Sequence, residues 1–282
     1  MCQAGYDALT LLLPVEGILA SGGNPVPGTA AVLGRFGKFR IGARVGFTSV
    51  VLPSSGYDGS SDTVKADKRL LVPMPRLDLS VGLFNKKLTM GTVGVDLLGS
   101  AVLIPTDLST RYRVDATARK IGPLALGLGY GFRAGMDMGK GKPTVSLSVV
   151  KRDLPIVHYG DMAGGNPSEV ATNLSAINVR LLVGGKLSIL TLSAGGGMDM
   201  YKGNGTVRWR DQVAGADSSL AVSLSDSRLT ATLNAALNFG FLSVWGEGGF
   251  QVGKTQELKT TFEGVDPNAG RFYGALGAAL TF

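Results

Sequence analysis

The chain has 282 residues with a net charge of +7, and it contains 42 glycines, one cysteine and one histidine. Apolar residues make up 44% and charged residues 17% of the chain, which excludes intrinsic disorder because disordered chains combine low hydrophobicity with high net charge. The single cysteine excludes a disulfide scaffold and a cysteine zinc cluster.

The first 37 residues have a composition of their own. Tyr6–Ala20 is rich in leucine and alanine and favours a helix, and the glycines and prolines of Ser21–Gly28 predict where it ends. The apolar stretch Leu9–Val15 is too short to cross a bilayer as a helix and lacks the form of a full signal peptide. Cys2 is either the acylated first residue of a mature lipoprotein or an inert thiol.

From residue 38 onward, apolar and polar residues alternate with a period of two. In Leu229–Phe239, leucine and alanine alternate with threonine and asparagine, and Leu124–Met136 alternates with glycine in the same way. Such alternation indicates strands with one apolar face. The strands expected are 38–51, 69–83, 88–104, 110–120, 122–136, 143–151, 154–162, 172–184, 186–202, 218–238, 241–254 and 270–282.

Tight turns and longer polar loops alternate between these strands. The turns are expected near residues 85–86, 121–122, 152–153, 184–185 and 240, and the loops at 53–68, 162–171, 203–226 and 254–269. This alternation is typical of an up-and-down meander whose two ends differ.

The character of the two faces predicts that the meander closes in a membrane. The polar faces are rich in small residues, which suit a confined interior. The apolar faces carry almost no charge over about ten residues, the length of a tilted transmembrane strand, and closure pairs every backbone N–H and C=O. We expect an all-β, antiparallel, up-and-down transmembrane β-barrel over residues 38–282, with about 12 strands or, alternatively, about 14. Residues 1–37 would then be a plug, a periplasmic segment or an unstructured tail.

The last strand carries a resemblance to a known class. Residues 272–282, FYGALGAALTF, place apolar residues at every second position and end in an aromatic residue. The segment resembles the C-terminal signature of bacterial outer-membrane β-barrel proteins. The resemblance implies that Phe272, Leu276, Leu280 and Phe282 belong to the strand read by the barrel-insertion machinery, and that the chain resides in the bacterial outer membrane.

Strand parity predicts which charged residues face the lumen. They are Arg40, Arg44, Arg76, Asp78, Asp96, Arg111, Arg113, Asp115, Arg119, Arg133, Arg180 and Glu247. Because buried charges must be paired or hydrated, some arginines are expected to bridge these acids and the surplus to make the interior positive. Two interpretations stay open, a pore that favours anions and a packed polar network that stabilises a closed barrel.

The leading functional prediction is an outer-membrane channel for small solutes, with a cationic lumen that favours anions. One alternative is a closed structural or interaction barrel that presents long extracellular loops. Another is a hydrophobic-ligand transporter with an N-terminal plug, because Asn24–Pro25 resembles the plug of long-chain fatty-acid transporters. Expected partners are outer-membrane lipid, lipopolysaccharide, the insertion machinery and small solutes, and no nucleic acid.

His158 is the only histidine, so an outer-membrane hydrolase would have to use it. Asp153 and Asp161 are the acids near it in sequence, and Ser168 could serve as a nucleophile only if the fold brought it close. No nucleophile motif accompanies these residues. We therefore predict that the chain is not an enzyme and uses no metal or cofactor.

Overall fold

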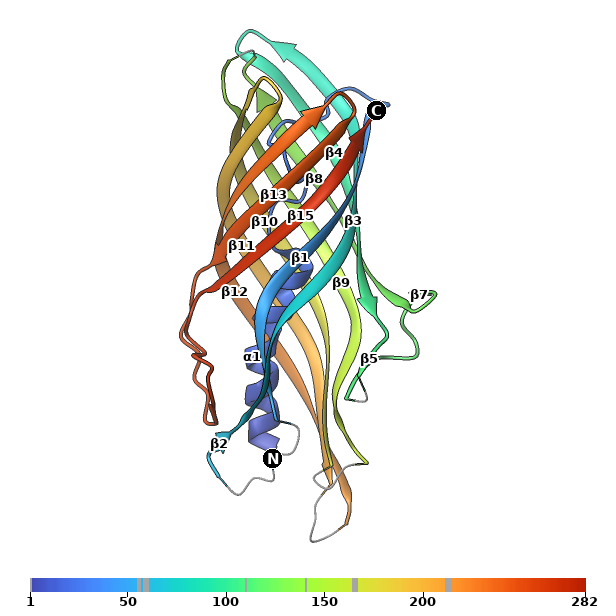
Figure 1. Cartoon of the computed structure of the whole chain (residues 1–282), viewed down its shortest axis with the longest axis vertical. Helices are drawn as coiled ribbons and strands as arrows, with labels where there is room; N and C mark the ends of the chain where they lie inside the picture. The colour runs from blue at the N-terminus through green and yellow to red at the C-terminus, as the bar shows by residue number, and fades with distance from the viewer. Residues whose placement is uncertain are drawn as a thin grey trace.

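The computed structural model of the chain describes residues 2–54, 57, 61–109, 111–139, 141–163, 167–210 and 215–282. Its helix within these residues is α1 (Cys2–Ser21) (Figure 1). The long strands are β1 (Phe39–Pro53), β3 (Ala66–Leu88), β4 (Gly91–Pro105), β8 (Leu124–Asp137), β9 (Thr144–Asp161), β10 (Ser168–Leu187), β11 (Leu190–Arg210), β12 (Asp217–Phe239), β13 (Leu242–Gln251) and β15 (Arg271–Thr281). The short strands are β2 (Thr63–Val64), β5 (Asp107–Ser109), β6 (Tyr112–Val114), β7 (Lys120–Ile121) and β14 (Thr261–Phe262).

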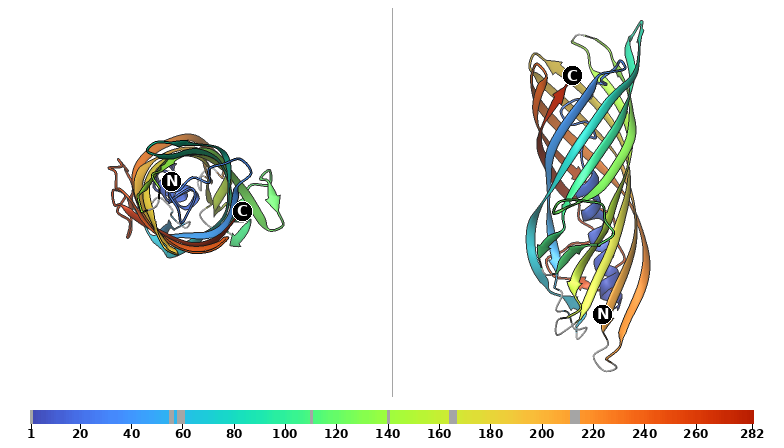
Figure 2. Two further views of the ribbon diagram at one scale, coloured as in Figure 1. Left: turned by 90° about the horizontal axis from the view of Figure 1, so that it is seen from above. Right: turned by 90° about the vertical axis from the view of Figure 1, so that its right-hand side faces the viewer.

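The 10 long strands form a closed ring, and the short strands lie outside it. Each long strand pairs antiparallel with its neighbours in the order given, and β15 pairs back to β1. Figure 2 shows the ring from above. Because the ring is closed, the backbone N–H and C=O groups of each strand can pair with those of its neighbours and need no water. The predicted antiparallel up-and-down β-barrel is thereby confirmed.

The two ends of the barrel differ. At the end that we call the short-turn end, β3–β4, β10–β11 and β12–β13 are joined by tight turns. At the opposite end, the long-loop end, longer connections join β1 to β3, β4 to β8 and β13 to β15. The C-terminus lies at the short-turn end and the N-terminus at the long-loop end (Figure 1).

The turn predicted near Arg152 is part of a strand. Residues 152–153 lie inside β9, so the predicted strands 143–151 and 154–162 are one. The backbone continues because Arg152 belongs to the inner face of the ring, where its Nη1 donates to Asn178 Oδ1 at 2.6 Å.

One predicted strand is part of a connection. Of residues 110–120, only Tyr112–Val114 (β6) and Lys120, the first residue of β7, are in strands, and residue 110 lies outside the described residues. The strand ends because Asp115 Oδ1 accepts a hydrogen bond from the backbone N–H of Thr117 at 2.8 Å, which closes a local turn. These two differences explain why 10 of the about 12 strands form the ring and the remainder lie outside it.

Apolar side chains cover the outside of the ring. On β12, Leu229 and Leu233 are 60% and 63% exposed, whereas Thr230 and Asn234 on the other face are buried. A water-soluble protein hides its leucines instead. The outward apolar face predicted from the alternation of β12 is confirmed.

The N-terminal segment occupies the interior of the ring. α1 lies inside the barrel, and the chain then runs through the lumen to the start of β1 at the short-turn end (Figure 2). Within the described part of the chain, no helix combines the length and the apolar character needed to cross a membrane.

Candidate functional site

The structure places eight of the twelve predicted lumen residues on the inner face of the ring. All are buried, with at most 7% of each residue exposed: Arg40, Arg44, Arg76, Asp78, Asp96, Arg133, Arg180 and Glu247. Because neighbouring residues on a strand face opposite sides, these side chains share the lumen with the N-terminal segment. A role as pore-lining residues stays a prediction.

The other four, Arg111, Arg113, Asp115 and Arg119, lie outside the lumen, so their predicted place is wrong. The segment that carries them belongs to the connection between β4 and β8 and does not form a ring strand. The three arginines are exposed and Asp115 is partly exposed. Alternation over a few residues could not distinguish a strand of the ring from a hairpin beside it.

Three further charged residues that are buried on the inner face were not predicted. They are Arg152, Asp199 and Arg228, and each is at most 2% exposed. Asp199, which pairs with Arg180, does carry a parity signal, since it continues the alternation of small residues along β11. Arg152 gave none, because a turn was expected at its position.

Several charges of the inner face form buried ion pairs. Arg133 Nη2 lies 2.6 Å from Asp96 Oδ2, and both side chains are completely buried. Asp78 is shared by Arg44 at 2.8 Å and Arg76 at 3.2 Å. Removing one partner would leave an unpaired buried charge, so these pairs constrain the wall.

The same charged residues also bind the backbone after α1, beginning at Asn24. Arg44 Nη1 donates to the Asn24 carbonyl at 3.0 Å, and Glu247 Oε2 accepts from the Asn24 N–H at 3.0 Å. The Asn24 side chain then folds the segment onto itself: its Nδ2 donates to the Thr29 carbonyl at 3.1 Å and its Oδ1 accepts from the Val26 N–H at 2.9 Å. Asn24 is therefore the residue through which the barrel wall holds the turn that follows α1.

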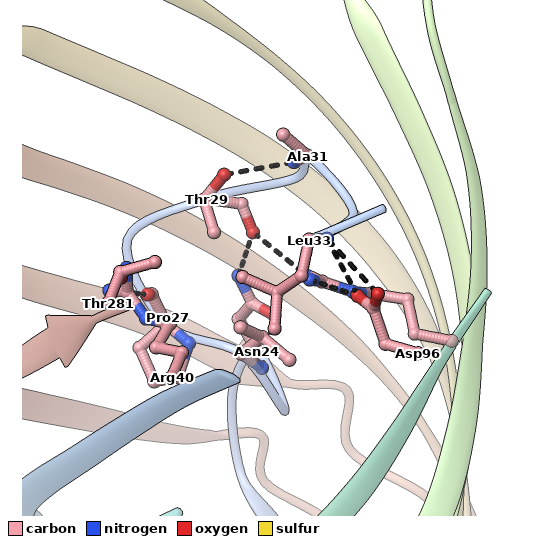
Figure 3. Close-up of polar contacts among 10 residues, drawn as sticks. Asn24, Pro27, Thr29, Ala31, Leu33, Arg40, Asp96 and Thr281 are labelled. Atoms are coloured by element: carbon pink, nitrogen blue, oxygen red, sulfur yellow. Dashed lines mark hydrogen bonds and ion pairs between the residues drawn. The ribbon is translucent and has the colours of Figure 1, made fainter. Parts of the chain in front are cut away.

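Figure 3 shows two more of these contacts nearer the short-turn end. Arg40 Nη2 donates to the Pro27 carbonyl at 3.0 Å. Both carboxylate oxygens of Asp96 accept from the Leu33 N–H at 3.1 Å. Wall charges thus replace the water that would otherwise satisfy this irregular backbone.

The helix α1 is held mainly by apolar contacts. Leu9 and Leu13 pack against Leu174 of β10 and against Tyr201 and Val207 of β11. All five are at most 3% exposed. The long-loop half of the lumen therefore has an apolar core between helix and wall.

A small cap covers α1 at the long-loop end. β2 and β14 pair in parallel, and Val64 and Phe262 pack on Leu11. Asp7, fully buried, accepts from the backbone N–H groups of Lys259 at 3.0 Å and Thr260 at 2.8 Å. The helix and the β13–β15 connection are tied together at this carboxylate.

A cavity of about 430 Å³ lies between α1, β1, β15 and the β13–β15 connection. Leu11, Leu12 and Val15 form its inner side, and Val51 of β1 and Phe272 of β15 form part of its outer side. Charged residues also line it: Lys65, Arg69, Glu263, Asp266 and Arg271. The cavity can accommodate a small molecule that is mostly apolar and has a polar end.

His158 is flanked by acids other than those expected. Its Nδ1 lies 3.1 Å from Glu169 Oε1 and its Nε2 lies 3.4 Å from Asp115 Oδ2. The predicted orienting acids Asp153 and Asp161 are not the carboxylates bound to the ring. Because both ring nitrogens are engaged by carboxylates, this arrangement orients the imidazole more than it offers it to a substrate.

The residues of the predicted insertion signal lie on the outer face at the end of the chain. Phe272, Leu276, Leu280 and Phe282 are 77%, 62%, 39% and 56% exposed. Phe282 stacks on Phe39 at 4.9 Å between ring centroids, which joins the last and first strands of the ring. Recognition by insertion machinery stays a prediction.

No family model and no curated protein matches the chain. Among solved structures, it is similar to the outer membrane protease OmpT from Escherichia coli, with 10% identity, a TM-score of 0.45 and coverage of 90% of this chain and 100% of that one. It is also similar to the translocator domain of the autotransporter NalP from Neisseria meningitidis, with 11% identity, a TM-score of 0.42 and coverage of 100% and 98%. The toluene transporter TodX of Pseudomonas putida matches with 11% identity, a TM-score of 0.32 and coverage of 86% and 88%.

The fold is that of bacterial outer-membrane β-barrel proteins. The ring is closed and antiparallel, and its leucines face outward, as in a barrel that spans a membrane. The C-terminal strand predicts that this membrane is the bacterial outer membrane.

The prediction that the chain is not an enzyme is overturned. One of the similar structures is a protease, so a barrel of this kind does not exclude enzymatic activity. The likeness assigns no protease chemistry to this chain, because 10% identity speaks only of the fold.

Proposed function

We propose that the protein is a plugged outer-membrane transporter for small, predominantly apolar molecules, with residues 1–37 as the plug. The observation that carries this proposal is the cavity of about 430 Å³ beside α1. It lies against the apolar side chains of Leu11, Leu12 and Val15 and is continuous with the barrel wall at Val51 and Phe272.

The barrel wall beside this cavity supports a route from outside. The ladder between β1 and β15 ends at the pair Thr48–Tyr273, while β1 itself continues to Pro53. Phe272, next to the end of that ladder, is 77% exposed. Beyond Thr48, β1 therefore pairs with β3 but no longer with β15. A ligand at the outer face would reach the cavity at this interruption of the wall.

A second cavity supports a route onward. It measures about 440 Å³ and lies at the short-turn end beside Thr29, Ala30 and Ala31, the part of the plug beyond the Asn24 turn. Between the two cavities, the wall charges bind residues 20–33. Transport would then require that these hydrogen bonds break or rearrange, which makes the plug the gate.

The anion-favouring channel remains a prediction that depends on the position of the plug. In the structure, inner-wall arginines donate to carboxylates and to carbonyls of the plug, as Arg44 does to Asp78 and Asn24. Displacement of the plug would uncover a wall in which buried arginines outnumber buried acids. Conductance with anion selectivity is expected only for that displaced state.

Uptake of a labelled apolar solute such as toluene into cells or proteoliposomes tests the proposal. Leu12→Trp fills the cavity from the half-buried side of α1 and is expected to reduce uptake several-fold. Leu233→Trp is the matched control, because it places the same ring on the lipid-facing side of β12. Equal uptake by both variants and the native protein would contradict the proposal.

A closed structural or interaction barrel is the second candidate, favoured by the way α1 and residues 22–33 fill the lumen. It predicts neither solute uptake nor channel events, even when the contacts of Asn24 with the wall are weakened. Single-channel recordings on the native protein and on the Gly23 variant described below distinguish the two candidates.

A further inference from the structure

The arginine cluster on the outer wall at the long-loop end contains residues that the sequence had placed in the lumen. We define it as Arg113 of β6, His158 of β9, Glu169 of β10 and Arg208 of β11, with Asp115 behind His158. In the ladders, Arg113 pairs with His158, and Glu169 pairs with Arg208. Four adjacent segments therefore bring these side chains together.

The cluster faces away from the lumen. Val207 and Val170 pack with the apolar core around α1. Because side chains alternate across a strand, Arg208 and Glu169, their next neighbours, point to the outer face. The two arginines of the cluster are well exposed, with 61% of the Arg113 side chain and 46% of the Arg208 side chain accessible.

The acid of the cluster is recessed behind the arginines. Only 4% of the Glu169 side chain is accessible. Its Oε2 accepts from Arg113 Nη2 at 2.6 Å, and its Oε1 lies 3.1 Å from His158 Nδ1 and 3.6 Å from Arg208 Nη1. Glu169 thus fixes two guanidinium groups and leaves their remaining N–H donors directed outward.

The position along the barrel places the cluster beyond the lipid tails. Tyr130 and Lys151 form a cross-strand pair on the outer face, with Tyr130 59% and the Lys151 side chain 42% exposed, and such residues mark the boundary of the apolar belt. His158 lies further along β9 toward the long loops, roughly 23 Å from Lys151 at about 3.3 Å per residue. In outer-membrane barrels that end is extracellular, where the leaflet consists of phosphorylated glycolipid.

We propose that the arginine cluster binds a phosphate group of outer-leaflet lipopolysaccharide. Arg113 and Arg208 each keep N–H groups that are not used by Glu169. Two guanidinium groups with such free N–H donors match the oxygens of a phosphate monoester. The connection that carries Arg113 also contains exposed Arg119 and Lys120. The site does not depend on transport, because it lies on the opposite side of the wall from the plug.

Binding of purified, full-length protein to phosphorylated lipopolysaccharide, measured by native mass spectrometry or thermophoresis, tests this proposal. The double substitution Arg113→Gln and Arg208→Gln is expected to weaken binding about tenfold, in line with the loss of charge-assisted hydrogen bonds. Enzymatically dephosphorylated lipopolysaccharide is expected to bind the native protein as weakly. Unchanged affinity in either comparison overturns the proposal.

Two further variants keep the test independent of folding. Arg210→Gln is the matched control: Arg210 lies on the same face of β11 two positions on, and its Nε is paired with Asp217 at 2.7 Å. It should leave affinity unchanged. Arg113→Lys keeps the positive charge but loses the guanidinium group that can donate two parallel hydrogen bonds. An affinity between those of the native protein and the double variant supports bidentate binding, whereas an affinity equal to that of the native protein contradicts it.

Displacement of lipopolysaccharide by an equal concentration of inorganic phosphate would overturn the assignment to lipid, since it would mark a site for free phosphate.

Discussion

The two parts of the N-terminal segment fill the same lumen by different means. α1 occupies the long-loop half, where Leu9 and Leu13 face apolar residues of β10 and β11. Residues 22–33 occupy the half nearer the short turns, where Glu247 and Asp96 accept their N–H groups. The lumen is thus apolar around the helix and charged around the irregular chain.

The difference follows from where backbone hydrogen bonds are made. A helix satisfies its own N–H and C=O groups except at its ends, so the wall around α1 needs only apolar surface. The C-terminal end of α1 follows this rule, because Arg76 Nη1 donates to the Ala20 carbonyl at 2.8 Å. An irregular segment has no internal partners, and a wall shielded from water must supply them. The charged residues of the inner wall are placed where the plug has no secondary structure.

Removing a charge from the irregular half is expected to have the largest effect. Asp96→Ala leaves the buried charge of Arg133 without its carboxylate and the Leu33 N–H without an acceptor. The expected cost is about 3–5 kcal/mol in the free energy of unfolding. Urea titration in detergent or lipid measures it.

The exposed pair of Arg210 and Asp217 provides the control. Asp217→Ala should cost less than about 1 kcal/mol, because exposed ion pairs contribute little. An equal loss of unfolding free energy for the two substitutions would contradict the view that the buried Asp96–Arg133 pair is essential to the fold.

The apolar half is tested by Leu9→Ala, which removes a side chain that is 1% exposed. Docking of α1 should weaken by about 2–5 kcal/mol, the range for buried leucine. The measurement is the rate at which protease cleaves residues 2–37 in the otherwise folded barrel. Leu237→Ala, on the lipid-facing side of β12, should leave that rate unchanged.

The junction between the halves is tested at Gly23. Its φ is +84°, and a Cβ there would overlap the Glu247 carboxylate. Gly23→Ala should therefore break the Asn24–Glu247 contact and increase channel events in a planar bilayer. Gly37 has a similar φ of +91° with open space around it, so Gly37→Ala carries only the backbone cost of about 1–2 kcal/mol. If the two variants conduct equally, the contact with Glu247 does not hold the plug.

The smallest effect is expected outside the lumen, at the β4–β8 connection. The Thr117 hydroxyl and backbone N–H, with a smaller contribution from His158, lower the pKa of Asp115 to about 2. Since the unfolded pKa is about 3.9, the stabilisation is complete above that value and is lost as the pH falls through about 2. Hydrogen exchange of the Thr117 amide should rise in that window relative to Asp115→Asn, whose exchange should show no such step.

Much of the barrel could be read from side-chain parity. The alternation in Leu229–Phe239 and in residues 272–282 depends only on which face of the strand is apolar. Each segment shows this in its own sequence, without reference to its neighbours. The turn expected at Arg152 was wrong because the partner that keeps that residue in the wall, Asn178, comes from another strand. The same holds for Arg113, whose neighbours His158 and Glu169 are distant in sequence.

The sequence alone determined the class of protein, because apolar faces with almost no charge alternate with faces of small polar residues on strand after strand, and this combination indicates a closed barrel in lipid. Only the tertiary structure decided what occupies the lumen and what the charges do there. A charged side chain pairs with whatever the fold brings within about 3 Å, and closure of the ring decides whether that neighbour is a carboxylate or a backbone carbonyl of the N-terminal segment.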